Sequence, residues 1–238
     1  MRKKNIMWNR IEVKARGKAA FRGNYWKCVV AAMVFGLLNG GVSGRSSVQY
    51  TQNYTNFAEV RGDVVEFLHS PVIIGGVVIS ILVGILVINA LEVGCNRFFM
   101  MNQLKPAELS ELGHGFTHNY WNNVGTILLR NVLIVLGTIL FIVPGIIMAY
   151  QYRMVPYILN EKPELSAGEA LSYSKQMMVG NKMEAFIYDL SFFGWYLLSG
   201  ITFGILGIFF VSPYKFSADA ELYLSIRSQE IEKESWNA

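Results

Sequence analysis

The tripeptide Asn-Tyr-Trp occurs twice in this chain, each time directly before a long apolar stretch. The copies lie at residues 24–26 and 119–121, and a degenerate third copy, Gly-Asn-Lys-Met, lies at residues 180–183. A second motif keeps the same order, because Asn-Gln-Leu-Lys-Pro-Ala-Glu-Leu-Ser at 102–110 precedes the second copy and Asn-Glu-Lys-Pro-Glu-Leu-Ser at 160–166 precedes the third. Two independent motifs in one order predict three copies of one structural unit.

Three stretches without a charged side chain, at 28–44, 70–91 and 131–152, are about as long as a membrane span, which needs roughly 20 apolar residues. Hydrophobic residues make up 53% of the chain and charged residues 16%, and the mean hydropathy is +0.33. These values favour an integral membrane protein over a soluble domain. The alternative that the first stretch is a signal peptide is disfavoured by the long patterned segment before it, which matches the lead-in to the later units.

Each unit is predicted to be an amphipathic interfacial helix followed by a transmembrane hairpin. The fold class is therefore an all-α integral membrane protein with about six membrane-embedded helices. Residues 1–238 are expected to form a single membrane domain. Its repeat units are expected at about 6–104, 105–162 and 163–230, with an outer polar loop at 45–70.

The second hairpin follows from length. A continuous helix from Val124 to Leu159 would reach about 54 Å, well beyond a hydrocarbon core of about 30 Å. Pro144 and Gly145 interrupt this run and predict the turn, with arms at about 121–143 and 145–160.

The third hairpin is predicted to turn at residues 212–214, Ser-Pro-Tyr, after an apolar run that begins at Ala185. The final arm, 214–227, then carries too many charges to face lipid, so it either faces the bundle interior or lies on the surface. A turn near Ser199 and Gly200 is the competing placement.

Basic residues predict the orientation in the membrane. Nine of them precede or include Lys27, and Arg97, Lys105, Lys162, Lys175 and Lys182 fall in the linkers, whereas the outer loop has two. The positive-inside rule therefore predicts a multi-pass plasma-membrane protein with a cytoplasmic N-terminus and a cytoplasmic C-terminus.

The first amphipathic helix carries a basic stripe. Its members recur every fourth residue and are the candidate contacts to anionic lipid: Arg10, Lys14, Lys18 and Arg22. Each contributes about 1 kcal/mol when held near an anionic leaflet. Trp8, Ile11, Ala15 and Ala19 form the expected apolar face. The alternative is a charged helix in water without a lipid role.

Charges within apolar segments are the best candidates for function, because they are costly there unless paired or hydrated. Snorkelling toward the interface is expected to explain Arg130 and Asp189. Arg153, Asp219 and Glu221 are expected to pair between the second and third units.

The candidate intramembrane polar cluster contains these three charges and two amides: Arg153, Asp219, Glu221, Asn89 and Asn131. Three roles stay open for it, namely a pair that fixes helix register, a polar cavity for substrate or ions, and a surface position.

No catalytic, cofactor-binding or metal-binding residues are predicted. Cys28 and Cys95 suggest neither a disulfide framework nor a zinc site. His114 and His118 have the spacing of a two-histidine metal site, but no third ligand is evident, which favours an interfacial polar pair. The basic residues track a membrane face, so nucleic acid is not an expected partner.

Several blocks carry a family resemblance: Phe-Ile-Val-Pro-Gly-Ile-Ile at 141–147, Glu-Ala-Leu-Ser-Tyr-Ser-Lys-Gln-Met-Met-Val-Gly at 169–180, Ser-Phe-Phe-Gly-Trp at 191–195, and Ser-Pro-Tyr at 212–214 with Ala-Glu-Leu-Tyr at 220–223. In these blocks the chain resembles domain-of-unknown-function family 975, multi-pass membrane proteins of Gram-positive bacteria. The resemblance implies a helical plasma-membrane protein and brings no activity, so no catalytic residue carries over.

The expected function is therefore that of a non-enzymatic scaffold, regulator or accessory subunit that binds membrane lipids or a membrane-protein partner. The alternative is a small transporter or channel. A transporter should show a hydrated path lined by the polar cluster, whereas a scaffold should show a packed interior and an exposed groove.

Overall fold

The structure, a computed structural model, describes residues 8–41 and 71–237. In these two ranges all regular structure is helical. The expected outer loop at 45–70 lies outside the described residues. The elements are α1 (Arg10–Gly23), α2 (Tyr25–Gly41), α4 (Pro71–Leu104), η1 (Leu109–Gly113), α5 (His114–Thr117), α6 (Tyr120–Leu140), α7 (Ile142–Gln151), α8 (Val155–Glu161), α9 (Ala167–Met177), α10 (Lys182–Leu190), α11 (Phe193–Ile201), the π-helical η2 (Gly207–Val211) and α12 (Ser212–Asn237).

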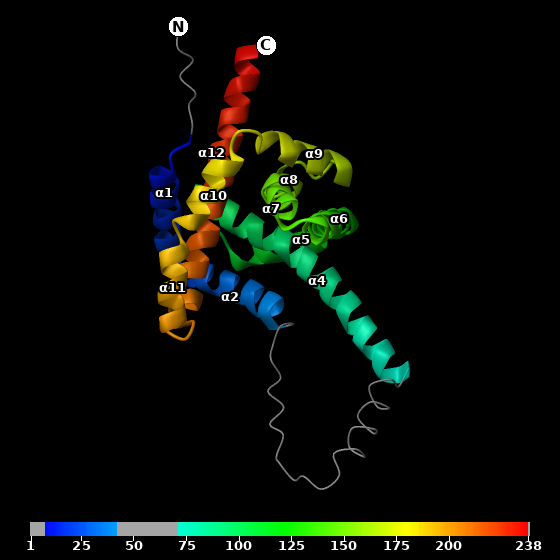
Figure 1. Ribbon diagram of the computed structural model, residues 1–238. Coiled ribbons are helices and arrows are strands. Elements are labelled where there is room, and N and C mark those ends of the chain that lie inside the picture. The colour runs from blue at the N-terminus through cyan, green and yellow to red at the C-terminus, as the bar shows by residue number, and fades with distance from the viewer. Residues whose placement is uncertain (1–7, 42–70, 238) are drawn as a thin grey trace.

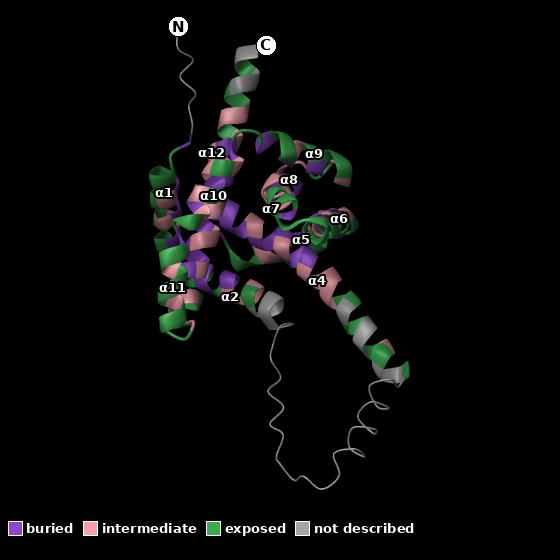
Figure 2. Ribbon diagram, in the orientation of Figure 1, coloured by how far each residue is buried: buried purple, intermediate pink, exposed green. Residues whose placement is uncertain are grey.

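The long helix α12 holds the fold together, with α1 packed along it and α4 crossing behind (Figure 1). Gly17 lets α1 approach α12 closely, because an added Cβ there would lie 2.5 Å from Cα of Ala218. Figure 2 shows that buried residues gather where these helices meet, while the N-terminal end of α4 and most of α11 are exposed. The sequence leaves two positions open for the arm 214–227, and the structure favours the inward one, because Leu222, Tyr223 and Ile226 are buried.

The buried face of α1 differs from the expected one. Trp8 is buried as predicted, but the helix packs through Val13, Gly17 and Phe21. Ile11, from the expected apolar face, is 79% exposed. The helix therefore packs on α12 through a face that sequence periodicity did not identify, because this contact selects small size at Gly17 as well as hydrophobicity.

The second hairpin, formed by α6 and α7, turns earlier than predicted. The chain reverses at Phe141, which is extended, and Pro144 lies in the first turn of α7. Proline is tolerated in the first helical turn, where the N–H that it lacks would have no helical partner. Gly145 instead allows close packing, because an added Cβ would lie 2.1 Å from Oγ1 of Thr138.

The third hairpin, formed by α10, α11 and η2, also turns before the predicted position. Phe203 and Gly204 have left-handed backbone conformations, with φ of 51° and 85°, and reverse the chain between α11 and η2. This turn lies close to the competing placement at Ser199 and Gly200. The prediction at residues 212–214 was wrong, since η2 continues there directly into α12.

The two Asn-Tyr-Trp copies make corresponding contacts. Asn24 donates from Nδ2 to the carbonyl of Ala107 at 2.9 Å, and Asn119 donates from Nδ2 to the carbonyl of Pro163 at 2.9 Å. Both acceptors lie in the Lys-Pro linkers that follow the respective hairpins. In each copy the tyrosine and tryptophan rings meet edge to face with centroids 5.2 Å apart.

Two helices in the described part of the chain are long and apolar enough to cross a membrane. They are Leu82–Leu104, with 23 residues, and Tyr120–Leu140, with 21 residues. Only 28% of the most apolar part of Tyr120–Leu140 is buried. Most of this apolar surface therefore finds no partner among the residues that the structure describes.

Candidate functional site

A charge cluster joins the second hairpin, the third hairpin and α12. It consists of Arg153, Asp189, Lys215 and Asp219. Arg153 lies in the turn between α7 and α8, Asp189 lies on α10, and the other two residues lie one turn apart on α12. Two positive and two negative side chains give the cluster no net charge.

The geometry of the charge cluster is that of a closed network. Arg153 donates to both carboxylate oxygens of Asp189, at 2.7 and 3.0 Å, and from Nη2 to Oδ1 of Asp219 at 2.9 Å. Lys215 contacts both carboxylates. Bidentate arginine–carboxylate pairs are among the strongest hydrogen-bonded pairs.

Two tyrosines complete the network. Tyr150 donates to Oδ2 of Asp189 at 2.9 Å, and Tyr188 donates to Oδ1 of Asp219 at 3.0 Å. The Arg153 side chain is only 17% exposed. Each charge in the cluster thus has several partners in the protein, as buried charges require.

The sequence expectation for this region is confirmed in part. Arg153 and Asp219 do pair between the second and third units, but Glu221 lies elsewhere. Asp189 was expected to snorkel and is instead a central member of the cluster. The reason is tertiary, because α10 brings Asp189 beside a cation that is 36 residues away in sequence.

Arg130 likewise does not snorkel. It forms a bidentate pair with Glu92, at 2.8 and 3.0 Å, and so joins α6 to α4. Its guanidinium also donates to Oδ1 of Asn131. Sequence reasoning missed Glu92, although a lone acid beside one apolar stretch and a lone arginine beside another were a visible signal.

The remaining amide of the predicted cluster, Asn89, lies on α4 and is buried. Its Nδ2 has no hydrogen-bond partner among the residues that the structure describes. The five predicted residues therefore occupy separate places: Arg153 with Asp219, Asn131 beside Arg130, Asn89 on α4, and Glu221 at a groove.

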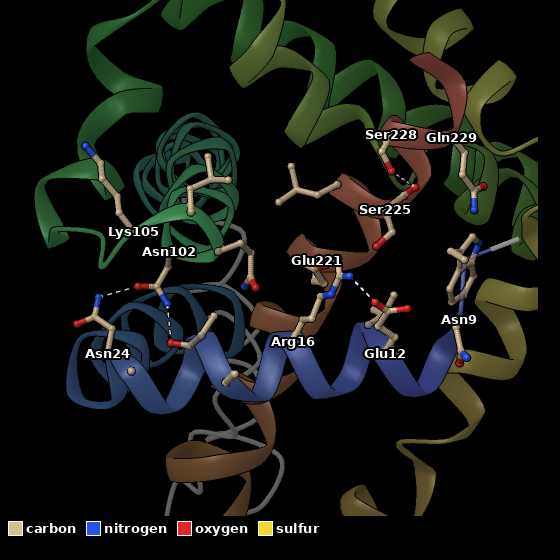
Figure 3. Close-up of a pocket in the computed structure, with 18 of the residues that line it drawn as sticks. Asn9, Glu12, Arg16, Asn24, Asn102, Lys105, Glu221, Ser225, Ser228 and Gln229 are labelled. Atoms are coloured by element: carbon tan, nitrogen blue, oxygen red, sulfur yellow. Dashed lines mark hydrogen bonds and ion pairs between the residues drawn. The ribbon is translucent and has the colours of Figure 1, made fainter. Parts of the chain in front are cut away.

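The groove lies between α1, the C-terminal end of α4 and α12, and has a volume of about 860 Å³ (Figure 3). From α12 it is lined by Glu221, Ser225, Ser228 and Gln229, which recur at helical spacing. Polar side chains thus face an open space of the size that small ligands occupy.

Glu221 and Arg16 form the central contact of the groove. Nη1 of Arg16 lies 3.3 Å from Oε1 of Glu221, and Arg16 also contacts Glu12. Glu221 is only 7% exposed. Burial raises the pKa of Glu221, and the nearby Arg16 opposes this shift.

At the opposite end of the groove, amides hold the chain in place. Asn24 donates to Oδ1 of Asn102 at 2.8 Å, and Asn102 donates to the carbonyl of Ala20 at 3.0 Å. Gln103 donates to the carbonyl and the hydroxyl of Ser217, both at 2.9 Å. These bonds fix the wall that α4 contributes.

The basic stripe of α1 has divided roles. Arg10 lies 3.7 Å from Glu184, and Lys14 donates to Ser191 at the third hairpin. Burial, followed by the charge of Lys215, lowers the pKa of Lys14. Lys18 is half-buried and Arg22 is exposed, so these two are the better placed of the four for contact with lipid.

His114 and His118 stack with ring centroids 4.2 Å apart. Burial, then the charges of Arg97 and His118, lower the pKa of His114. In the described ranges no group of three His, Cys, Asp or Glu side chains is arranged to hold a metal ion.

Comparison with known proteins gives one result. Residues 120–230 match the model of a family described as a protein of unknown function (DUF975). The family resemblance expected from the sequence is therefore confirmed, over the second and third hairpins and most of α12. No curated protein and no solved structure matches the chain.

Proposed function

We propose that this DUF975 chain is a multi-pass plasma-membrane protein built from three repeated units, with both termini in the cytoplasm. Two features support a membrane location. The second hairpin leaves most of its apolar surface unpacked, which a core helix of a soluble protein does not do. Trp26 and Trp121, at the starts of the first two hairpins, are 70% and 75% exposed, as is typical of aromatic residues at a membrane interface.

The repeat is supported by matching hydrogen bonds. Asn24 and Asn119 each fasten the start of a hairpin to the linker that follows it. Equivalent residues making equivalent bonds are expected where one unit has been duplicated.

Within this membrane protein, we assign the groove as the binding site for a membrane-protein partner or a lipid headgroup, and the protein as a non-enzymatic scaffold, regulator or accessory subunit. One observation carries this choice. The charges between the hairpins neutralise one another in a packed network, whereas the polar side chains of the groove face open space.

The transporter alternative has less support. It requires one hydrated path lined by Arg153, Asp219, Glu221, Asn89 and Asn131. Of these five residues only Glu221 lines the groove, and Arg153 and Asp219 bind each other. Ion flux into liposomes reconstituted with the purified protein, and lost in Glu221→Gln, would favour transport over scaffolding.

The membrane topology is tested with single cysteines in a protein that lacks Cys28 and Cys95. Cysteines at Ser47 and Tyr54 should react with an impermeant thiol reagent on intact cells, whereas those at the exposed Glu108 and Ser172 should react only in inverted vesicles. Reaction at Ser172 on intact cells would contradict a second hairpin that returns to the cytoplasm.

The groove assignment is tested with a photocrosslinking amino acid at Ser228 or Gln229, introduced in native membranes. Lys175 on α9 is exposed and lies outside the groove, so it is the control position. Crosslinks to one protein or lipid should form from the groove positions and be lost when Ser225→Trp fills the groove. Equal crosslinking from Lys175 would contradict a specific site.

We also expect Lys18 and Arg22 to contact anionic lipid. Lys18→Gln with Arg22→Gln should weaken co-purification of anionic lipid with the detergent-solubilised protein, and raised salt should have the same effect on the unaltered protein. Unchanged retention of anionic lipid in the double variant would contradict the contact.

A further inference from the structure

The turns of the second and third hairpins are apolar. At the second turn, Leu140, Phe141 and Ile142 are each 71% exposed, and at the third turn Phe203 is 98% exposed. A turn that emerges into water is normally built from polar residues, because exposed apolar groups order water and promote aggregation. These turns therefore fit a solvent other than water.

Charged residues are also absent from the two turns and from the sequence around them. Residues 131–152 and 190–214, which contain the two turns, carry no charged side chain. The charges begin at once beyond them, at Arg130, Arg153, Asp189 and Lys215, and each of these four is ion-paired. By contrast, the sequence of the predicted outer loop, 45–70, holds five charged residues: Arg45, Glu59, Arg61, Asp63 and Glu66.

The backbone of the third turn is suited to a medium without water. The N–H groups of Phe203 and Gly204 donate to the carbonyls of Gly200 and Ser199, at 3.2 and 2.8 Å. The N–H of Leu206 donates to the hydroxyl of Thr202 at 3.2 Å. In hydrocarbon such internal bonds are required, because each unsatisfied polar group costs several kcal/mol.

The second turn pairs part of its backbone internally and removes one further donor with proline. Phe141 donates its N–H to the carbonyl of Gly137, and Gly145 donates its N–H to the carbonyl of Phe141. Pro144, in the first turn of α7, has no N–H to satisfy. A helix start normally leaves several donors without a helical partner, and here one of them is removed.

The lengths of the arms limit how far the hairpins reach. From Arg130 to Leu140, α6 rises about 15 Å, and α7, with its 10 residues, also spans about 15 Å. The charge-free part of the second hairpin is thus about half as long as a hydrocarbon core of about 30 Å is thick.

We infer that the second and third hairpins are re-entrant: they enter the bilayer from the cytoplasmic side, end among lipid acyl chains, and return without exposing their turns on the outer surface. The inference rests on the proposed membrane location and specifies which solvent meets each turn. Only the first unit, with its charged loop, then passes a loop to the outside.

The test places single cysteines at Phe141 and Phe203 in full-length protein in which Cys28 and Cys95 are replaced by alanine. Impermeant thiol reagent is applied to intact cells and to inverted vesicles, and total thiol is measured after denaturation. We expect neither cysteine to be labelled, either on intact cells or in inverted vesicles. A cysteine at Glu108 is the control and should react in inverted vesicles.

Labelling at either turn on intact cells would overturn the inference and show a hairpin that spans the bilayer. Labelling at the turns in inverted vesicles would overturn it as well, because the turns would then meet cytoplasmic water. Recovery of the chain outside the membrane fraction would instead refute the proposed membrane location, so the two failures are distinguishable.

A second readout uses a nitroxide attached to the same cysteines in liposomes. Collision with oxygen, which concentrates in hydrocarbon, should exceed collision with a water-soluble nickel complex at both turns, and the reverse should hold at Glu108. Ile142→Cys and Ile205→Cys repeat the test if either first variant fails to fold. A nickel response at the turns equal to that at Glu108 would contradict burial in lipid.

Discussion

Nη2 of Arg153 lies 2.9 Å from Oδ1 of Asp219, and this contact ties the end of the second hairpin to α12. The same guanidinium donates two hydrogen bonds to the carboxylate of Asp189 in the third hairpin. Because charges of equal number and opposite sign meet here, the loss of one charge strands another in a place that water barely reaches.

Arg153→Met should therefore lower the stability of the detergent-solubilised protein by about 3 to 5 kcal/mol. Adding Asp189→Asn should recover much of the loss, because Lys215 and Asp219 remain as a neutral pair. Melting temperatures of the single and double variants measure this coupling, with Lys175→Met as an exposed control. Losses that simply add would show that the charges are not coupled.

Close packing of α6 against α7 depends on Gly145. Gly145→Val should destabilise the protein by about 1 to 3 kcal/mol, because the new side chain would overlap Thr138. Gly125→Ala, on the partner helix α6 and with open space around it, should be neutral or slightly stabilising. If thermal unfolding gave the same loss for both variants, the hairpin would not be packed as described.

Asn119 has two roles that different substitutions separate. Its backbone is left-handed, with φ of 48°, and its side chain holds Pro163. Asn119→Ala should lose the hydrogen bond and also force alanine into the left-handed conformation, and each effect should lower stability by about 1 kcal/mol. Asn119→Gly should lose only the hydrogen bond, because glycine adopts this conformation freely. Denaturant unfolding of the two variants checks the order, and equal losses would remove the role of backbone conformation.

Local signals were sufficient for some elements. Ser166 and Glu169 have the spacing of a capping box, and the structure shows that box at the start of α9. The Asn-Tyr-Trp motifs mark the starts of α2 and α6, because the motif combines a turn-forming asparagine with aromatic residues that begin an apolar helix.

Turn positions were harder to predict because proline has two meanings. Pro144 and Pro213 interrupt apolar runs, which indicates a turn. Pro144 instead lies in the first turn of α7, where proline is well accommodated, and Pro213 lies where the π-helical η2 passes into α12. The actual turns at Phe141 and Phe203 carry no polar turn signal. Because turns are normally predicted from polar residues, the hydrophobic residues at these two positions gave no indication of a turn.

Pairings between units depend on tertiary structure. Nothing in the spacing of Glu92 and Arg130 predicts their contact, since 38 positions separate them and they lie on different helices. Arg16 and Glu221 are 205 positions apart. Only the packing of α1 on α12 brings them together, and with them the groove.

The pH dependence of stability should show whether burial or the charge of Arg16 has the larger effect on Glu221. Burial raises the pKa of this carboxyl above its usual value, while Arg16 opposes the rise. A raised pKa means that the folded state binds the proton more tightly than the unfolded state does. Stability from this group should therefore increase as pH falls through the interval between the raised pKa and the usual value.

Glu221→Gln mimics the protonated carboxyl and should remove this dependence. Near neutral pH the variant should be at least as stable as the parent protein, and the difference in melting temperature should shrink to zero on acidification below about pH 4. Arg16→Ala is the matched change, because loss of the guanidinium should raise the folded-state pKa of Glu221 further and extend the interval to higher pH. The opposite result would be a loss of stability in Glu221→Gln near neutral pH that disappears in acid. It would mean that the attraction of Arg16 outweighs the cost of burial, so that the ion pair between Arg16 and Glu221 stabilises the fold.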